Sequence, residues 1–166
     1  MRVAGLALLC LIVGGPFGAT ARAQERHEHA GGGAGTNLGE VSFANSGSAA
    51  AQAPFLRGLA LLHSFEYGEA ADAFREAQRA DASFAMAYWG EAMTYAHLLW
   101  GEDDPAGARA ALARLAPSRA ARLARAGTAR ERAFGAAIES LFAEATLAAR
   151  TTAFADSMRG VSAAYN

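Results

Sequence analysis

From Ser48 onward the chain repeats one pattern, in which apolar residues recur at steps of three and four between turns of only a few residues. Tyr67, Ala70 and Phe74, for example, fall on one helix face. Such spacing predicts α-helices, and alanine, the strongest intrinsic helix former, supplies 45 of the 166 residues. Because the connection before Tyr67 is very short, the helices on either side of it must pack antiparallel. The chain is therefore predicted to be all-α and built of antiparallel helical hairpins.

Two helix starts can be placed from their capping residues. Asp104 is a favourable N-cap with Pro105 in the first helical position, and Thr128 and Glu131 form a capping box. Together with the apolar spacing, these signals predict helices over 49–65, 67–79, 84–100, 105–115, a short Arg-rich stretch in 117–127, 129–142 and 147–164.

The first 23 residues have the pattern of a secretory signal peptide. Arg2 precedes the apolar run VAGLALLCLIV, which is followed by helix breakers and then by small residues ending in Ala23. This run is too short to cross about 30 Å of hydrocarbon, so we expect cleavage between Ala23 and Gln24 rather than a retained anchor. Cys10 follows Leu9, where a lipoprotein signal needs a small residue. The expected location is therefore periplasmic or secreted, without a lipid anchor.

The mature chain offers few of the features that mark a catalytic or nucleic-acid-binding protein. After cleavage, 13 Arg and 16 acidic residues would remain, with a net charge of −3 and no cysteine. The Arg residues are dispersed, which argues against nucleic acid as a partner, and no membrane contact is expected once the signal peptide is removed. No nucleotide-binding glycine loop, nucleophile elbow or cysteine ligand set occurs. We therefore predict no enzyme activity and no cofactor.

Three regions are expected along the chain: the signal peptide at 1–23, a lead-in at 24–48 and a helical repeat domain at 49–166. The lead-in contains GGGAG and many Gly, Ser and Asn residues, without sustained periodicity, so it is predicted to be flexible. Val41 and Phe43 are its two candidates for docking on the first helix.

A repeat of 34 residues connects the first hairpin to the next one. The shift brings Gly58 onto Ala92, Leu61 onto Tyr95 and His63 onto His97. A two-helix unit of this length resembles the tetratricopeptide repeat (TPR). The small residues Gly58, Ala70 and Ala77 and the large residues Leu61, Tyr67 and Phe74 resemble the positions through which the two helices of that repeat pack. The resemblance implies hairpins stacked as a right-handed solenoid.

More narrowly, the phrases LALLHSF and AMAYWG resemble those of uncharacterised exported bacterial TPR proteins. That resemblance implies a longer family pattern, of which this chain is an N-terminal part or a shortened member, and self-association through the C-terminal hairpin is then expected. It also implies a cysteine pair at the positions of Gly47 and Phe84, which this chain lacks.

Two histidines are the main candidates for chemistry. His63 is followed by Glu66 and Glu69, and His97 is its repeat equivalent, so one hypothesis is a metal-binding protein or metal-dependent enzyme. The His-Glu-x-x-His spacing on one helix is absent. The alternative for His63 is a residue at the helix end that bonds a backbone carbonyl.

The function favoured by the sequence is a non-catalytic scaffold that binds a protein or peptide. In TPR proteins the first helices of successive hairpins line a concave groove, and the resemblance extends this role to the corresponding apolar positions. The predicted groove residues are Phe55, Leu59, Leu62, Trp89, Met93 and His97. A third hypothesis is a purely structural repeat segment of a larger solenoid.

Overall fold

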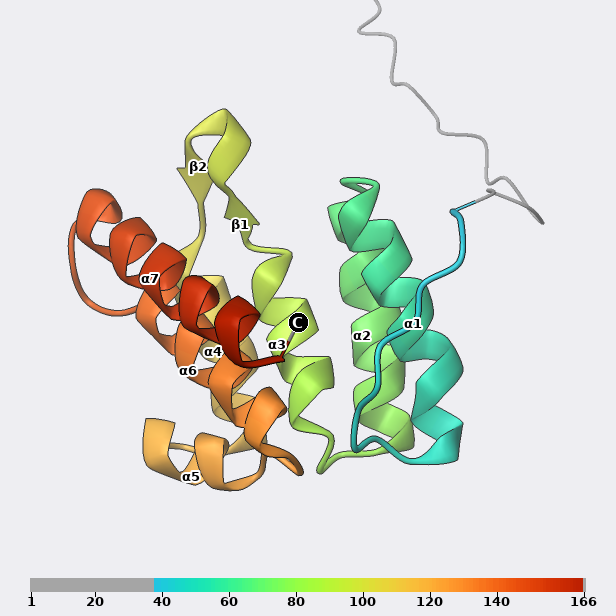
Figure 1. Ribbon diagram of the computed structural model, residues 1–166. Coiled ribbons are helices and arrows are strands. Elements are labelled where there is room, and N and C mark those ends of the chain that lie inside the picture. The colour runs from blue at the N-terminus through green and yellow to red at the C-terminus, as the bar shows by residue number, and fades with distance from the viewer. Residues whose placement is uncertain (1–37, 166) are drawn as a thin grey trace, which may run out of the picture. The chain divides into compact units, whose positions relative to one another are not determined.

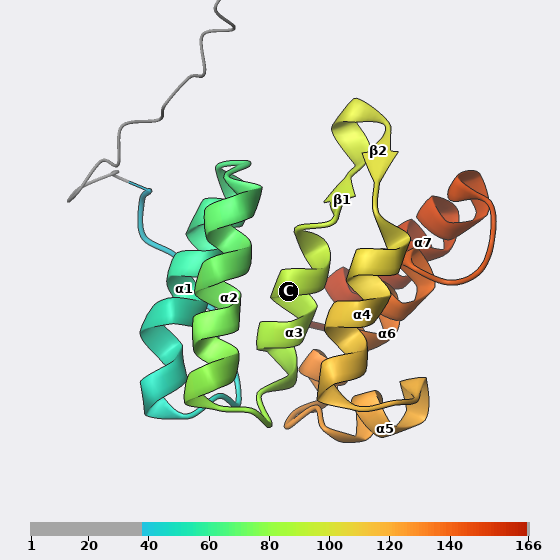
Figure 2. The ribbon, with the colours of Figure 1, turned by 180° about the vertical axis from the view of Figure 1, so that it is seen from behind.

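A computed structural model describes residues 38–165, so the predicted signal peptide, its cleavage site and most of the lead-in lie outside the described residues. Within this range the chain is mostly helical, which confirms the all-α prediction (Figures 1 and 2). The elements are α1 (Ala49–His63), α2 (Tyr67–Ala80), α3 (Ala85–Met93), β1 (Ala96–His97), η1 (Leu98–Trp100), β2 (Glu102–Asp103), α4 (Pro105–Leu115), α5 (Arg119–Ala124), α6 (Ala129–Leu141) and α7 (Leu147–Tyr165).

The helices are arranged so that each one packs against one or more of the others. Helix α2 packs between α1 and α3, and α3 in turn contacts α4 and α6. Helix α7 packs on α6 and, in Figure 1, runs in front of α3 and α6. Helices α2 and α4 face the viewer when the molecule is turned round (Figure 2). The two faces of the helical layer are thus built from different helices.

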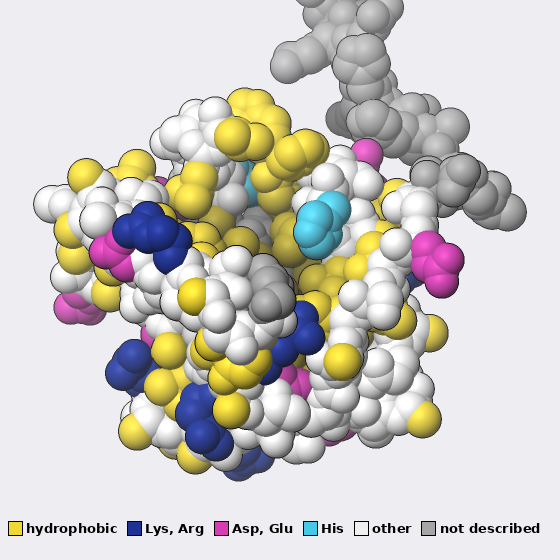
Figure 3. Space-filling view, viewed as in Figure 1, with side chains coloured by type: hydrophobic (Ala, Val, Ile, Leu, Met, Phe, Trp, Pro, Cys, Tyr) yellow, Lys and Arg dark blue, Asp and Glu magenta, His cyan; other side chains and the backbone are white. Residues whose placement is uncertain are grey.

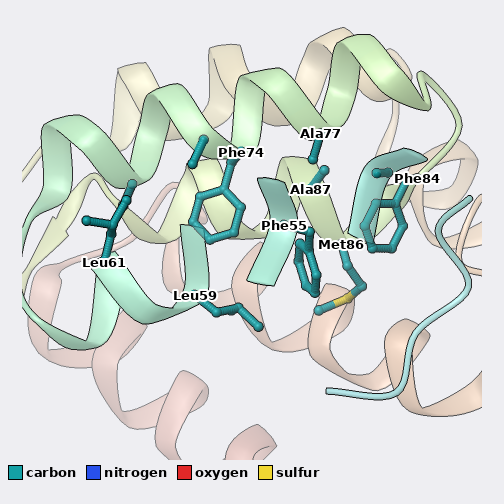
Figure 4. Close-up of a cluster of buried hydrophobic side chains, with 11 residues drawn as sticks. Phe55, Leu59, Leu61, Phe74, Ala77, Phe84, Met86 and Ala87 are labelled. Atoms are coloured by element: carbon teal, nitrogen blue, oxygen red, sulfur yellow. The ribbon is translucent and has the colours of Figure 1, made fainter. Parts of the chain in front are cut away.

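The core of the first hairpin is centred on Phe74, which is fully buried together with Phe55 (Figure 4). A Cβ atom added at Gly58 would lie 2.8 Å from the Phe74 ring, and one added at Gly90 would lie 2.3 Å from it. Both distances are too short for carbon atoms in contact, so the ring fits only against glycine. The small residue expected at Gly58 is present for this reason, and Gly90 plays the same part from α3.

Phe55 also connects the hairpin to the start of α3. Its ring centroid lies 4.8 Å from that of Phe84 in an edge-to-face arrangement and 5.9 Å from that of Phe43. Gly47 lies beside Phe84, because a Cβ added there would be 2.7 Å from the ring. The two positions at which the family resemblance implies a cysteine pair are therefore in contact.

The end of the predicted lead-in, residues 38–48, packs against the helices. Val41 and Phe43 contact the first core, as expected from the sequence. The Ser46 backbone N–H and hydroxyl donate to the two carboxylate oxygens of Glu131, at 2.7 and 2.8 Å, and the Ser48 N–H donates to Asp81 at 2.9 Å. The folded unit therefore begins before α1, and the Glu131 side chain connects α6 to a segment 85 residues away.

The prediction of a single helix over 84–100 is wrong in its second half. Helix α3 ends at Met93, and the chain then forms a two-stranded antiparallel hairpin in which Ala96 pairs with Asp103. The turn requires a left-handed residue, which Gly101 supplies with φ of +69°. The Tyr95 carbonyl accepts from the Asp104 N–H at 3.0 Å and closes the loop.

A buried carboxylate joins α2, α3 and α4. Glu91 is fully buried and accepts from Arg75 Nε at 2.9 Å and from Gln78 Nε2 at 2.6 Å, and Arg114 Nη2 donates to it as well. A buried carboxylate is costly unless it is paired and hydrogen-bonded, and these three donors meet that need.

The later helices follow their predicted caps. The Asp104 side chain accepts from the Gly107 N–H, and the capping box of Thr128 and Glu131 is complete, so both predicted starts are confirmed. Helix α7 is held at its first turn by Arg150, which is buried and whose Nη1 donates to Asp103 Oδ2 and to the Leu141 carbonyl, both at 2.8 Å. Among the helices that the structure describes, none is long and apolar enough to cross a membrane.

Candidate partner-binding groove

A groove of about 760 Å³ lies on the face of the molecule shown in Figure 1. Figure 3 shows apolar side chains gathered around a hollow at the middle of this face. We call it the central groove and define it by its lining residues: Glu40, Val41, Ser42, Phe43, Leu59, Leu62, His63, Phe65, Tyr67, Trp89, Met93, Ala96, Phe134, Phe154 and Met158.

The walls of the central groove come from segments far apart in the sequence. Helix α1 contributes Leu59 and Leu62, α3 contributes Trp89 and Met93, α6 contributes one Phe, and α7 contributes a Phe and a Met. Glu40 is the only acidic group among the lining residues, and His63 is the only other ionisable group apart from one Tyr. The groove therefore offers hydrophobic contact and few charges.

Three aromatic residues that line the central groove, Phe43, Trp89 and Phe134, are connected by ring contacts. The Trp89 ring lies 5.6 Å from that of Phe134, edge to face, and the Phe43 ring also lies 5.6 Å from Phe134. The Arg130 guanidinium stacks over Phe43 at 4.4 Å from the ring centre. The indole N–H of Trp89 is buried and has no acceptor among the described residues. Trp89 is thus fixed by packing on rings rather than by hydrogen bonding.

Four of the six residues predicted for the groove line it: Leu59, Leu62, Trp89 and Met93. Phe55 lies in the first core and has no exposed surface. His97 lies in β1, beyond the end of α3, and packs on Tyr67 with ring centroids 4.1 Å apart. The expected step of four from Trp89 through Met93 to His97 does not exist, because the helix ends at Met93.

The sequence prediction misses the residues that complete the groove. The apolar spacing places Phe134 on the buried face of α6 and Phe154 and Met158 on the apolar stripe of α7, but nothing in it indicates that they face α1 and α3. Phe43 comes from the lead-in. The available signal is the four-residue step between Phe154 and Met158, which marks an apolar helix face without identifying what lies opposite.

An exposed apolar rim lies at one end of the central groove. Phe65 and Tyr67 line the groove, and the ring of Trp100 lies 5.6 Å from Phe65 and 6.1 Å from Tyr67. Phe65, Leu99 and Trp100 are exposed residues, with 53%, 77% and 57% of their surface accessible to water. Phe65 has φ of +62°, an uncommon conformation for a residue with a side chain. Burial raises the pKa of the Tyr67 phenol, so this ring remains neutral.

The two histidines are each engaged with the backbone. His63 is the last residue of α1, and its Nδ1 lies 2.7 Å from the Leu59 carbonyl oxygen, as expected for a residue at a helix end. His97 Nε2 lies 2.9 Å from the Thr94 carbonyl oxygen. Within residues 38–165, no three His, Cys, Asp or Glu side chains are grouped so that they could hold a metal ion.

No protein-family model, curated protein or solved structure matches this chain. Its function is therefore inferred from its own residues and their geometry.

Proposed function

We propose that the chain is an exported, non-catalytic scaffold of TPR type that binds an amphipathic helix of a partner protein in the central groove. The observation that carries this proposal is the groove itself, an apolar hollow lined from five helices and the lead-in and continued by an exposed apolar rim. Exposed apolar surface of this kind is typical of interaction sites. Export rests on the signal-peptide pattern, and the mass of the exported protein would test it by the loss of residues 1–23.

The apolar rim supports a partner larger than a small molecule. Leu99 and Trp100 lie on the β1–β2 hairpin and expose most of their side chains to water. Through Phe65 and Tyr67 this surface continues into the groove. A ligand confined to the hollow would leave the rim uncovered, whereas a helix lying along it would cover both.

Helix α7 indicates what shape of ligand suits this face. Its residues Phe154 and Met158, four apart, turn their apolar side chains into the groove, and Val161 continues the stripe as a buried residue. A helix with apolar residues at i, i+4 and i+7 therefore already packs along one side of the hollow. A second helix of the same pattern suits the side formed by Leu59 and Leu62, in the helix-in-groove mode of recognition.

Peptide display followed by a fluorescence titration would test the proposal. Because the chain has only two tryptophans, Trp100→Phe leaves Trp89 as the single reporter in the groove. A library of amphipathic helical peptides should yield binders with large apolar residues at i, i+4 and i+7, and their titration should shift the Trp89 emission in a saturable way.

The matched variants are Leu62→Glu in the groove and Leu147→Glu, an exposed residue at the start of α7 that does not line it. Leu62→Glu should weaken peptide binding at least about tenfold, because a carboxylate would be desolvated against apolar side chains. Equal binding by both variants, or selection of peptides without helical apolar spacing, would contradict the proposal.

A further inference from the structure

A second pocket, of about 310 Å³, lies between α2, α3 and α4 and is lined by basic and polar side chains. Helices α2 and α4 face the viewer in Figure 2, and the pocket shares no lining residue with the central groove. The pocket is lined by Arg75, Gln78, Arg79, Tyr88 and Arg114. We call it the arginine pocket.

The carboxylate of Glu91 holds two arginines of the arginine pocket, Arg75 and Arg114, in place. The Arg75 Nε and Arg114 Nη2 groups both donate to this fully buried carboxylate. The Arg75 side chain is also held by Asp72 at 3.0 Å and by the Tyr95 hydroxyl at 3.4 Å. Long basic side chains lose much rotamer freedom on binding a ligand, and here the structure has already imposed that ordering.

Two of the lining arginines, Arg79 and Arg114, keep unused hydrogen-bond donors. Arg114 uses Nη2 for its hydrogen bonds to Glu91 and to Gln78 Oε1, so its Nε and Nη1 groups have no acceptor within residues 38–165. The Arg79 side chain is exposed and forms no hydrogen bond or ion pair with any described residue. Arg79 therefore plays no part in pairing the Glu91 carboxylate, and Arg114 uses only its Nη2 group for that purpose.

The charge balance of the arginine pocket favours an anion. Three guanidinium groups line it, against the buried carboxylate of Glu91 and the exposed carboxylate of Asp72. Burial acts to lower the pKa of Arg75, but the hydrogen bond and charge of Glu91 raise it overall, so this cation persists at any physiological pH. An excess of positive charge is left facing water.

We propose that the arginine pocket binds a phosphate group. Guanidinium groups present their N–H donors in a fork that matches phosphate oxygens. Donors reach this pocket from both α2 and α4, and a tetrahedral anion can accept from several directions at once, whereas a planar carboxylate is matched by one fork. The volume also leaves space beside Tyr88 for a small group attached to the phosphate.

NMR titration of the purified protein with inorganic phosphate would test this site, with sodium chloride adjusted to hold ionic strength constant. Saturable shifts are expected at the side-chain Nε–H signals of Arg114 and Arg79 and at the Gln78 side-chain amide. Acetate at the same ionic strength should give a several-fold weaker response. Equal affinity for acetate would overturn the assignment to phosphate.

Arg79→Gln and Arg57→Gln form a matched pair, since both arginines are exposed and Arg57 lies on α1, outside the pocket. Arg79→Gln should reduce phosphate affinity about tenfold or more, because a charge-assisted hydrogen bond to the anion would be lost. Arg57→Gln should leave it unchanged. Equal losses in both variants, or shifts that grow linearly without saturation, would show non-specific screening and overturn the proposal.

Discussion

The hairpin of α1 and α2 and the hairpin of α6 and α7 have similar lengths but are held together differently. Helices α1 and α2 bury residues along their whole length, with Phe74 inserted against Gly58 and Gly90. Helix α7 has 19 residues, of which only Arg150 and Val161 are buried. The first hairpin is fixed by side-chain interlock, whereas α7 in the second is held by one buried polar anchor at its start and by partly buried apolar side chains such as Phe154.

This difference bears on the central groove, because its walls belong to both hairpins. Leu59 and Leu62 belong to the tightly packed hairpin and provide a rigid wall. Phe154 and Met158 belong to α7, which has fewer buried contacts and therefore a lower cost of local displacement. In the proposed complex, the α7 wall is therefore the one expected to move, which would widen the groove without disturbing the core.

The largest expected effect is that of Phe74→Ala. The ring is fully buried between two glycines, so its removal leaves a cavity and should lower the free energy of unfolding by about 3–5 kcal/mol. The counterpart Phe154→Ala, at a partly buried position in α7, should cost about 1–2 kcal/mol. Urea denaturation of the two variants measures both values, and equal losses would mean that the hairpins are equally well packed.

A second test removes the polar anchor of α7. Arg150→Met breaks a buried ion pair and leaves Asp103 and the Leu141 carbonyl without this donor, which should cost on the order of 3 kcal/mol. Because the anchor is local, amide hydrogen exchange should accelerate in α7 and remain nearly unchanged in α2.

Arg159→Met is the control for that experiment, since Arg159 belongs to the same helix but its pair with Asp156 is exposed. A surface pair contributes at most about 1 kcal/mol, so exchange in α7 should hardly change. If Arg150→Met accelerated exchange in α2 as much as in α7, the two hairpins would unfold as one unit and the proposed contrast between the groove walls would be wrong.

The features that the sequence predicts well are those set by nearby residues. Asp104 and Thr128 bond backbone groups three residues away, so their capping roles are contained in short stretches of sequence. The helix predicted over 84–100 is wrong because EAMTYAHLLW has helical apolar spacing throughout, while the actual break depends on the left-handed Gly101 and on pairing with residues 102–103.

The residues of the central groove are predicted only in part, because some of them come from segments far apart in the sequence. Leu59, Leu62, Trp89 and Met93 lie on first helices of hairpins, where the repeat pattern places them. The contribution of Phe43 depends on a lead-in that Glu131 holds in place across 85 residues, and that of Phe154 depends on how α7 packs on α6. Contacts between segments so far apart leave no periodic signal in a single sequence.

The smallest effects concern glycine, and here the two hairpins should respond with opposite signs. At Gly58 a methyl group would meet the Phe74 ring at 2.8 Å, so Gly58→Ala forces the ring to move and should destabilise the protein by about 1–3 kcal/mol. At Gly160, inside α7, the same methyl group meets no atom within 4 Å, so Gly160→Ala should gain about 0.5–1 kcal/mol of helix propensity. Thermal and urea denaturation of both variants would check the signs.

A loss of stability in Gly160→Ala would mean that this part of α7 is packed more closely than its exposed surroundings indicate, and a gain of stability in Gly58→Ala would mean that the Phe74 ring can shift freely. Either result would remove the contrast between an interlocked and an anchored hairpin.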